Sequence, residues 1–541
     1  MTTYSRPGVF INELPLAAGP VNGTAAATSA GAVIAAFPQG PEAVTKVTSW
    51  YDFTKRFGGY NKKYPATFGV ASFFKNGGTE LYVRRILSAN ATTASVTVPI
   101  NHSGAGNLLK IAAKNRGLDG NNIRLKFSKS GLVKTSGYWD LSVYLEGETS
   151  STADDILVEQ FNGLVFDDAD SSDYIATVLD FNSKYIKVDS TVNVNTTDTY
   201  GPSLALLPLT GATTPENALT YAEYTGDATQ YESGDTPDYT ACTLFREFEV
   251  IDQPLVFFLP DVISQLSTWS AAVPVYRVLI DWAATNLHFV IAEFAKDTAV
   301  NAAVSAAADL TVANPGIPNR NSRVAAYYPH LYITDPLGHS GNAVRKIGPA
   351  GAVAGQYLAT DAKIGPFKAA AGINAQLSDA IAIEKAFTPA ELDALNSGVT
   401  TDGTAKAAVN AIRNLPGAGV VIMGGRTLQQ DGTANRYVNM RRSLIYVEKR
   451  LKDLASFALF ENNSEQLWSR INTTLGVFLN EYRNQGGLRG TTVDEAFFIK
   501  CDEENNTPAT IAAGEVHIEV GVALEYPAEF VVINLSQKTA N

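Results

Sequence analysis

The stretch "HIEVGVALEYPAEFVVINL", residues 517–535, combines two apolar strand patterns close to the end of the chain. The first pattern alternates strictly between apolar and polar positions, which is typical of a half-buried strand. Its apolar positions share one face: Val516, Ile518, Val520, Val522 and Leu524. The second pattern begins after Pro527 and is apolar almost without a break. Chain ends are usually polar and frayed, so an apolar end predicts a strand that a sheet holds in place.

The beginning of the chain has the same character. The stretch "YSRPGVFINE", residues 4–13, is rich in strand-forming residues, and Pro7 and Gly8 exclude an early helix. Two apolar arms on one chain predict that their partner sheets belong to other copies of the protein. The residues predicted to exchange strands between subunits are Val9, Phe10, Ile11, Phe530, Val531, Val532, Ile533 and Leu535.

Length and charge limit the possible classes of protein. A chain of 541 residues predicts three or four domains at about 150 residues each. The net charge of −12 argues against a protein that binds duplex DNA or an anionic membrane surface. The only two cysteines, Cys242 and Cys501, lie far apart and offer neither a disulfide framework nor zinc-ligand spacing. No stretch reaches the roughly 18 apolar residues of a membrane helix, and the first residues do not resemble a signal peptide.

Composition and periodicity divide the chain into segments of different character. Strand and helix patterns alternate in the first and third of these segments, whereas the second is rich in Ser, Thr, Asp and Asn and consists of short alternating strands. The pattern therefore predicts a mixed α/β multidomain protein. The expected segments are an arm at 1–25, an α/β segment at 26–90, a mainly β insertion at 91–220, an α/β insertion at 221–400, a helical segment at 401–515, and a final strand and arm at 516–541.

Capping residues and apolar periodicity predict several helix boundaries. Ser49 followed by Asp52, and Thr388 followed by Pro389, predict N-terminal caps. A single helix is expected over residues 263–286. Further along, Asn463 is the expected cap of a helix that buries Trp468, Ile471, Leu475, Phe478 and Tyr482.

The helix expected from "VNMRRSLIYVEKRLKDL", residues 438–454, has an apolar and a basic side. The apolar side consists of Leu444, Val447, Leu451 and Leu454. The basic side consists of Arg442, Lys449 and Lys452. Either this side is an ordinary solvated face or it contacts an acidic partner.

The sequence contains no motif that specifies an enzyme. No P-loop, H-E-x-x-H or G-x-S-x-G sequence occurs, and no two of the five histidines have metal-ligand spacing on a helix. "GPAGAVAGQY" at 348–357 fits helix packing by small residues better than phosphate binding. "DEENN" at 502–506 fits a solvated acidic loop better than a cation site. We therefore predict no catalytic, cofactor-binding or metal-binding residues, and no enzyme.

Several stretches resemble one known family, the contractile tail sheath proteins of phage tails, R-type pyocins and related injection machines. The C-terminal module of that family resembles "RNLPGAGVVIMGGRTL" at 413–428, "RYVNMRRSLIYVEKRL" at 436–451, "AFFIKCDEENNT" at 496–507 and the stretch at 517–535. The opening segments of the family resemble residues 4–13 and "FFKNGGTELYVRRI" at 73–86. The motifs stand in the family's order along the chain.

The resemblance implies an architecture and a function. Residues 26–90 and 401–515 would form one inner domain beside a tail tube, with the inserted domains facing outward and both arms reaching neighbouring subunits. The chain would polymerise as a helical cylinder around the tail tube and contract to drive the tube through a cell envelope. Arg442, Lys449 and Lys452 would be a possible tube contact.

The same resemblance implies the partners and the location. The partners would be further copies of the chain, the tail tube protein, and the baseplate and tail terminator proteins, with no cofactor, no direct nucleic-acid contact and no membrane insertion. The location would be the virion tail, assembled in the bacterial host cytoplasm. Two alternatives stay open: a soluble α/β hydrolase-like enzyme with an unrecognised site, and a non-contractile surface-array protein. The sequence does not distinguish a phage from a phage-derived bacterial device.

Overall fold

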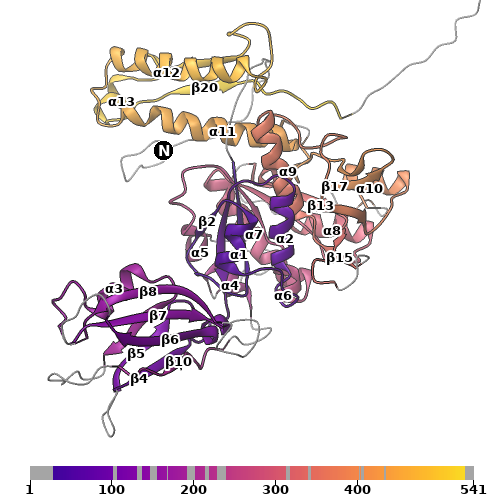
Figure 1. Cartoon of the computed structure of the whole chain (residues 1–541). Coiled ribbons are helices and arrows are strands. Elements are labelled where there is room, and N and C mark those ends of the chain that lie inside the picture. The colour runs from indigo at the N-terminus through magenta and orange to yellow at the C-terminus, as the bar shows by residue number, and fades with distance from the viewer. Residues whose placement is uncertain are drawn as a thin grey trace, which may run out of the picture.

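The computed structural model of the chain (Figure 1) has several sheets with helices packed against them, which confirms a mixed α/β multidomain fold. It describes residues 29–100, 107–130, 137–146, 155–166, 168–191, 202–213, 219–227, 229, 239–311, 317, 319–338, 343–400, 403, 407–431 and 434–529. All eight residues predicted to exchange strands lie outside the described residues.

An eight-stranded sheet forms the centre of the largest domain, in the order β18-β17-β13-β12-β11-β1-β3-β2. The six inner strands are parallel, and the edge strands β2 and β18 are antiparallel to their neighbours. Strands covered on both faces need apolar residues at every position, as the fully buried "AGAVIAA" of β1 illustrates. The strands are β1 Ala30–Ala36, β2 Thr45–Val47, β3 Leu81–Ile86, β11 Leu255–Phe258, β12 Phe289–Ala292, β13 Val324–Tyr328, β17 Val409–Leu415 and β18 Gly419–Ile422.

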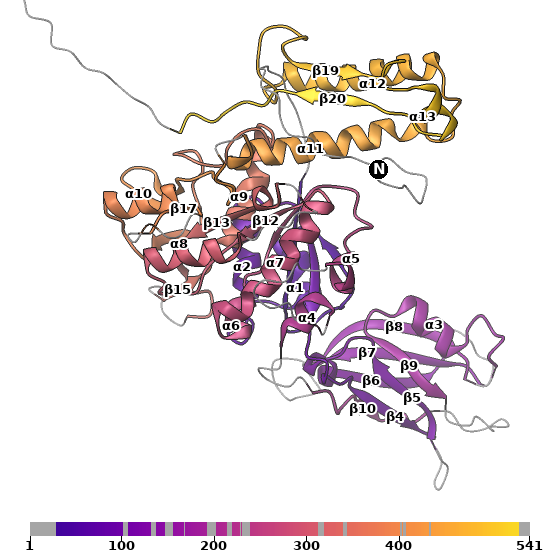
Figure 2. The same cartoon turned by 180° about the vertical axis from the view of Figure 1, so that it is seen from behind.

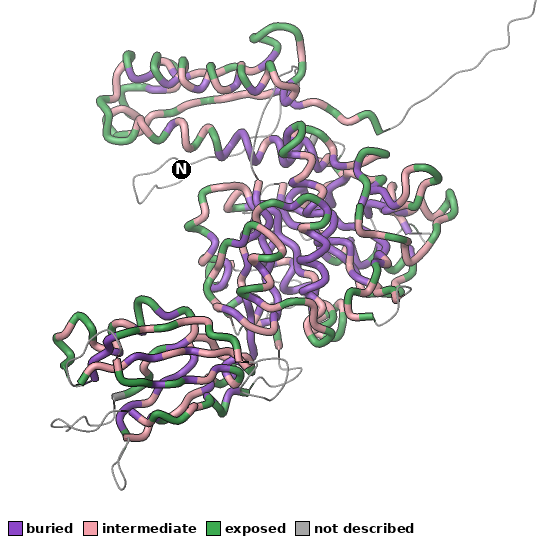
Figure 3. Tube along the Cα trace, in the orientation of Figure 1, coloured by how far each residue is buried: buried purple, intermediate pink, exposed green. Residues whose placement is uncertain are grey.

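Helices cover both faces of this sheet, so the domain has three layers (Figures 1 and 2). Buried residues are concentrated in this domain (Figure 3). One face carries α1 (Trp50–Phe57), α2 (Ala66–Lys75) and α9 (Ala350–Lys363). The other face carries α4 Tyr221–Thr225, α5 Thr243–Arg246, α6 Val262–Leu266, α7 Trp269–Thr285, α8 Val300–Asp309 and α10 Pro389–Ser397. A small sheet, in the order β15-β14-β16, lies beside the domain: β14 Leu331–Thr334, β15 Val344–Ile347 and β16 Ala380–Ile383.

The pairing of these strands differs from the expected grouping of the chain. Residues 26–90 were expected to form one domain with 401–515, and 221–400 a separate one. Instead, β1 pairs in parallel with β11, from Ala30 opposite Leu255 to Val33 opposite Phe258. Because β1 is fully buried and lies inside the sheet, it needs a neighbour on each side, and β11 supplies the second.

The segment expected as a mainly β insertion forms two sheets, which are visible at the bottom of Figure 1. A hydrophobic core of its own lies between these sheets. One sheet has the order β10-β6-β7-β8 and the other β4-β5-β9. Its elements are β4 Ser95–Pro99, β5 Asn107–Ala113, β6 Ile123–Lys129, β7 Trp139–Leu145, β8 Ile156–Leu164, α3 Ile175–Asn182, β9 Ile186–Thr191 and β10 Leu206–Pro208.

Two helix caps are confirmed and two boundaries differ. The Ser49 side chain accepts the Asp52 N–H, and Thr388 forms a capping box with Glu391. The helix expected over 263–286 is broken between α6 and α7, where Ser267 has a left-handed φ of 67° and Thr268 caps the second helix. The cap expected at Asn463 is also wrong: its side-chain oxygen accepts the Trp468 indole N–H at 2.8 Å.

Candidate strand-exchange interface

The last described part of the chain is a separate layer that lies across the α/β domain (Figures 1 and 2). We call it the C-terminal layer. It consists of α11 Val438–Ala455, α12 Glu465–Asn484, β19 Phe497–Lys500, α13 Pro508–Ala512 and β20 Glu519–Val522. The alternating apolar face predicted from the sequence packs against these helices: Val516, Ile518, Val520, Val522 and Leu524. The apolar side predicted for the helix at 438–454 packs in the same two clusters.

The sheet of this layer has only two strands. β19 and β20 pair antiparallel, with Phe497 opposite Val522 and Lys500 opposite Glu519. Within the described ranges neither strand has a second strand partner. One edge of each strand thus has no strand partner in the part of the chain that the structure describes, and an edge of this kind can accept an added strand.

The alternation in the sequence is longer than the strand that forms. β20 covers four residues and begins only at Glu519, because the Asn506 side chain binds both backbone groups of the preceding His517. Asn506 Oδ1 accepts the His517 N–H at 2.6 Å, and its Nδ2 donates to the His517 carbonyl at 3.0 Å. On the outward face, the half-exposed Phe498 ring lies over Gly521, where a Cβ would overlap the ring. The outward face of the sheet is therefore aromatic and flat at its centre.

The segment that leads into the C-terminal arm is tied to the α/β domain. Arg426 Nε and Nη2 donate to the two carboxylate oxygens of Glu529 at 2.7 and 2.6 Å. Arg426 Nη1 donates to the Asn396 carbonyl at 2.7 Å, and Asn439 Nδ2 donates to the Glu525 carbonyl at 3.3 Å. A bidentate pair fixes both position and direction, so it holds the last described residue, Glu529, against the α/β domain. Twelve residues follow Glu529, which span about 40 Å if fully extended.

The basic side predicted for α11 is not one surface. Arg442 is buried: Nη1 donates to Asp361 Oδ1 at 2.9 Å, Nη2 pairs with Oδ2, and the guanidinium lies 4.6 Å from the Tyr357 ring centre. Lys449 is also buried and pairs with Asp252 at 3.2 Å, whereas Lys452 is exposed. α11 lies between the α/β domain and α12, so neither of its long sides is fully open to solvent.

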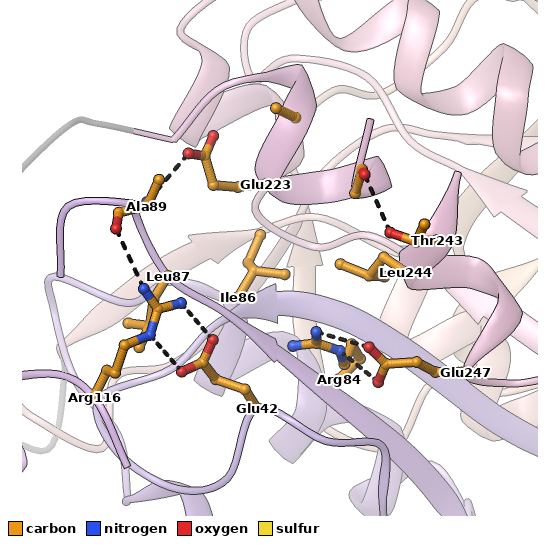
Figure 4. Close-up of a pocket in the computed structure, with 12 residues that line it drawn as sticks. Glu42, Arg84, Ile86, Leu87, Ala89, Arg116, Glu223, Thr243, Leu244 and Glu247 are labelled. Carbon is orange, nitrogen blue, oxygen red and sulfur yellow. Dashed lines mark hydrogen bonds and ion pairs between the residues drawn. The ribbon is translucent and has the colours of Figure 1, made fainter. Parts of the chain in front are cut away.

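The inserted β domain meets the α/β domain at a polar joint around a cavity of about 350 Å³ (Figure 4). Arg116 donates to both carboxylate oxygens of Glu42 at 2.8 and 2.7 Å, which lowers the pKa of Glu42. Arg84 pairs with Glu247 at 2.9 Å. The Arg116–Glu42 pair thus joins the inserted domain to the α/β domain, whereas the Arg84–Glu247 pair lies within the α/β domain at the same cavity.

Buried acids lie at the carboxyl ends of two central strands. Burial raises the pKa of Asp261, which follows β11, and of Glu293, which follows β12, to about 7 each. Asp261 accepts the Ala36 N–H and the Tyr224 hydroxyl, and Glu293 accepts the Ala350 N–H. No group of three His, Cys, Asp or Glu with metal-binding geometry was found in the part of the chain that the structure describes.

Other candidate motifs from the sequence have structural roles. The glycine-rich stretch at 348–357 falls largely within α9, where a Cβ at Gly351 or Gly355 would overlap backbone oxygens of α2. Close helix packing therefore explains these glycines. Cys501 is buried, and burial raises the pKa of its thiol to about 11. Among the described helices none is long and apolar enough to cross a membrane.

The family of the C-terminal region follows from comparison with known sequences. The family described as "Phage tail sheath C-terminal domain" matches residues 430–538, which include the entire C-terminal layer. This layer therefore resembles the C-terminal domain of phage tail sheath proteins. A related curated protein, the tail sheath protein of Vibrio phage KVP40, is 26% identical over 186 residues, which cover 34% of this chain. The match spans 26% of the length of that relative.

The fold of the whole chain agrees with that of solved sheath assemblies. A cryo-EM structure of the anti-feeding prophage (AFP) helical sheath in the contracted state has a TM-score of 0.52 at 20% sequence identity, covering 99% of this chain and 100% of that chain. A structure of the AFP baseplate in the contracted state has a TM-score of 0.55 at 19% identity, covering 99% of each chain. The C-terminal layer therefore belongs to a chain that has the same overall fold as these proteins.

Proposed function

We propose that the chain is the structural subunit of a contractile tail sheath, which polymerises as a helical cylinder around a tail tube and contracts to drive that tube through a target cell envelope. The observation that carries the proposal is the match to the sheath C-terminal domain, together with its two-stranded sheet, whose outer edges have no strand partner among the described residues. The apolar segments at both chain ends are suited to fill those edges in neighbouring copies.

Strand addition supplies the connection between subunits. Each added main-chain hydrogen bond contributes about 0.5–1.5 kcal/mol net, and each large apolar side chain that becomes fully buried contributes about 1.5–3 kcal/mol. Two arms on every subunit join the cylinder into a mesh, whose avidity exceeds that of one contact. The mesh keeps neighbours connected while the globular domains repack during contraction.

The partners and the location follow from the same role. The subunit binds further copies of itself, the tail tube, and the baseplate and tail terminator proteins, and it acts without enzymatic turnover in the tail of a virion assembled in the bacterial host cytoplasm. The similarity to sheath and baseplate assemblies of the anti-feeding prophage supports self-assembly and baseplate association. For the tube contact, Lys452 is the exposed member of the three basic residues predicted from the sequence.

Electron microscopy of the purified chain tests this function. The full chain is expected to form hollow cylinders. Deletion of residues 530–541, which keeps the Glu529 anchor, or of residues 1–14 is expected to abolish them while the subunit stays folded. A matched variant keeps the arm length but replaces Val531, Ile533 and Leu535 by Ser, and it is expected to fail in the same way. Long normal cylinders from a folded truncation contradict strand exchange, and discrete small oligomers from the full chain contradict the sheath role.

A further inference from the structure

Phe460 is an exposed aromatic residue in an unfavourable backbone conformation. It lies in the turn between α11 and α12, has a left-handed φ of 64°, and is 91% exposed. Two backbone hydrogen bonds frame the turn, from Leu459 N to the Ser456 carbonyl and from Glu461 N to the Ala458 carbonyl. Gly or Asn adopts this conformation at lower cost than a bulky residue. Among the described non-glycine residues with positive φ, Phe460 is the one that combines an aromatic side chain with nearly full exposure.

The surroundings of Phe460 are acidic. Residues 501–516, which contain α13, include four acidic residues and no Lys or Arg. They lie beside the turn, since Asn463 Nδ2 donates to the Glu515 carbonyl at 2.9 Å. We define the acidic tip as Phe460 with the acidic side chains of its turn, of the start of α12 and of residues 501–516: Glu461, Glu465, Glu503 and Glu515. Of these, Glu461 pairs with Arg470 at 3.9 Å. It occupies the end of the C-terminal layer that carries α13, at the upper left in Figure 1.

The residues in and directly after α1 carry the opposite charge. Residues 51–63 contain four basic residues and one acidic residue, and that acidic residue, Asp52, already pairs with Arg56 at 2.8 Å. Tyr51 is exposed, and the ammonium group of Lys55 lies 4.5 Å from its ring centre. We define the basic patch as Tyr51, Lys55, Lys62 and Lys63. It offers an aromatic surface together with cations, which complements an apolar side chain inside an acidic rim.

The tip and the patch do not meet within one subunit. α13 and α1 lie well apart in both views of the chain, in Figures 1 and 2. No ion pair among the described residues joins the two surfaces. A contact between them therefore requires a second copy, and because the two surfaces differ, that contact is heterologous and extends into a chain of subunits.

We propose that the acidic tip of one subunit docks through Phe460 on the basic patch at α1 of a neighbouring copy. This contact is additional to strand exchange and rests on the proposed self-assembly of the chain. It explains why a bulky aromatic residue occupies a left-handed turn position on the surface.

Site-directed cross-linking tests the contact directly, because both native cysteines, Cys242 and Cys501, are buried. Full-length chains carrying Glu461→Cys and Lys62→Cys are mixed under mild oxidation, and a disulfide-linked dimer is expected on a denaturing gel. The control pairs Phe181→Cys with Lys62→Cys, because Phe181 is 82% exposed but lies on the inserted β domain. Cross-linking of the control pair at an equal yield, or no cross-link in the first pair, overturns the proposal.

Assembly of substituted chains provides a second test. Phe460→Gly is expected to lower the yield of assembled cylinders about tenfold or more, as truncation of an interface anchor does, while the unfolding midpoint of the subunit stays equal or rises. Phe181→Ser is the matched control and is expected to assemble normally. Charge reversal at Glu461 and Glu465 together is expected to reduce assembly, and added reversal of Lys55 and Lys62 in the same chain to restore it.

The outcomes separate this contact from the proposed function. Cylinders formed equally well by the wild type and by Phe460→Gly overturn the docking contact and leave the sheath role intact. A wild-type chain that forms no cylinders overturns the sheath role and, with it, this contact.

Discussion

Replacement of Arg442 by Met tests whether α11 is held to the α/β domain by a buried ion pair. The side chains of Arg442 and Asp361 are 4% and 2% exposed. The substitution leaves the Asp361 carboxylate buried without its cation, which typically costs about 3–5 kcal/mol. It also removes the contact between the guanidinium and the Tyr357 ring. Because α11 connects the C-terminal layer to the α/β domain, the loss is expected at the attachment of that layer.

Hydrogen exchange of the α11 amides measures this loss. A reduction of about 3–5 kcal/mol in opening free energy raises the exchange rates by about two to three and a half orders of magnitude, at about 1.4 kcal/mol per tenfold change. Lys452→Met on the exposed side of the same helix is the control and is expected to stay within about 0.5 kcal/mol. The double variant Arg442→Met with Asp361→Asn is expected to recover part of the loss, since it removes both charges. Unchanged exchange in Arg442→Met, together with loss of assembly, refutes the buried-pair reasoning and supports the surface contact predicted from the sequence.

Three further predictions follow from other contacts. Burial raises the pKa of Asp261 to about 7, so its stabilising contribution is complete below about pH 4 and is lost as the pH rises towards 7. Asp261→Asn is therefore expected to raise the melting temperature at pH 8 and to change it little at pH 4, and a lower melting temperature at both pH values contradicts this. Gly355→Ala is expected to destabilise the α2–α9 contact by about 1–3 kcal/mol in denaturant titrations, whereas Gly59→Ala, with nothing within 4 Å, is expected to be neutral. Glu529→Ala removes the pair with Arg426 and is expected to speed hydrogen exchange of the adjoining segment without shifting the melting temperature; a clear fall in that temperature argues against a local anchor.

Local features of the fold were predictable because neighbouring residues decide them. The Ser49 and Thr388 caps depend on a side chain and a backbone N–H three residues away. The alternation from Val516 to Leu524 predicts which side chains face the core, and they do pack against the helices. The length of β20 was not predictable, because Asn506 limits the start of the strand by bonding to His517, which is eleven residues away.

Long-range pairing accounts for the corrections. β1 and β11 are neighbours in the sheet although the whole inserted β domain lies between them in sequence, and periodicity carries no information about such a partner. The basic residues on α11 illustrate the same limit. Arg442 pairs with a buried acid 81 positions away, whereas Lys452 on the same helix is exposed. A residue's charge indicates what it can pair with, but not where that partner lies.

The sequence by itself determined the composition of the cores, the caps, the alternating face of the last strands and the resemblance to a sheath domain, because each depends on residues near one another in the chain. Only the tertiary structure decided which segments share the central sheet, which edges of the β19–β20 sheet lack a strand partner among the described residues, and which charges reach the surface. Those properties depend on the burial and pairing of residues that are distant in sequence, and burial is a property of the packed molecule.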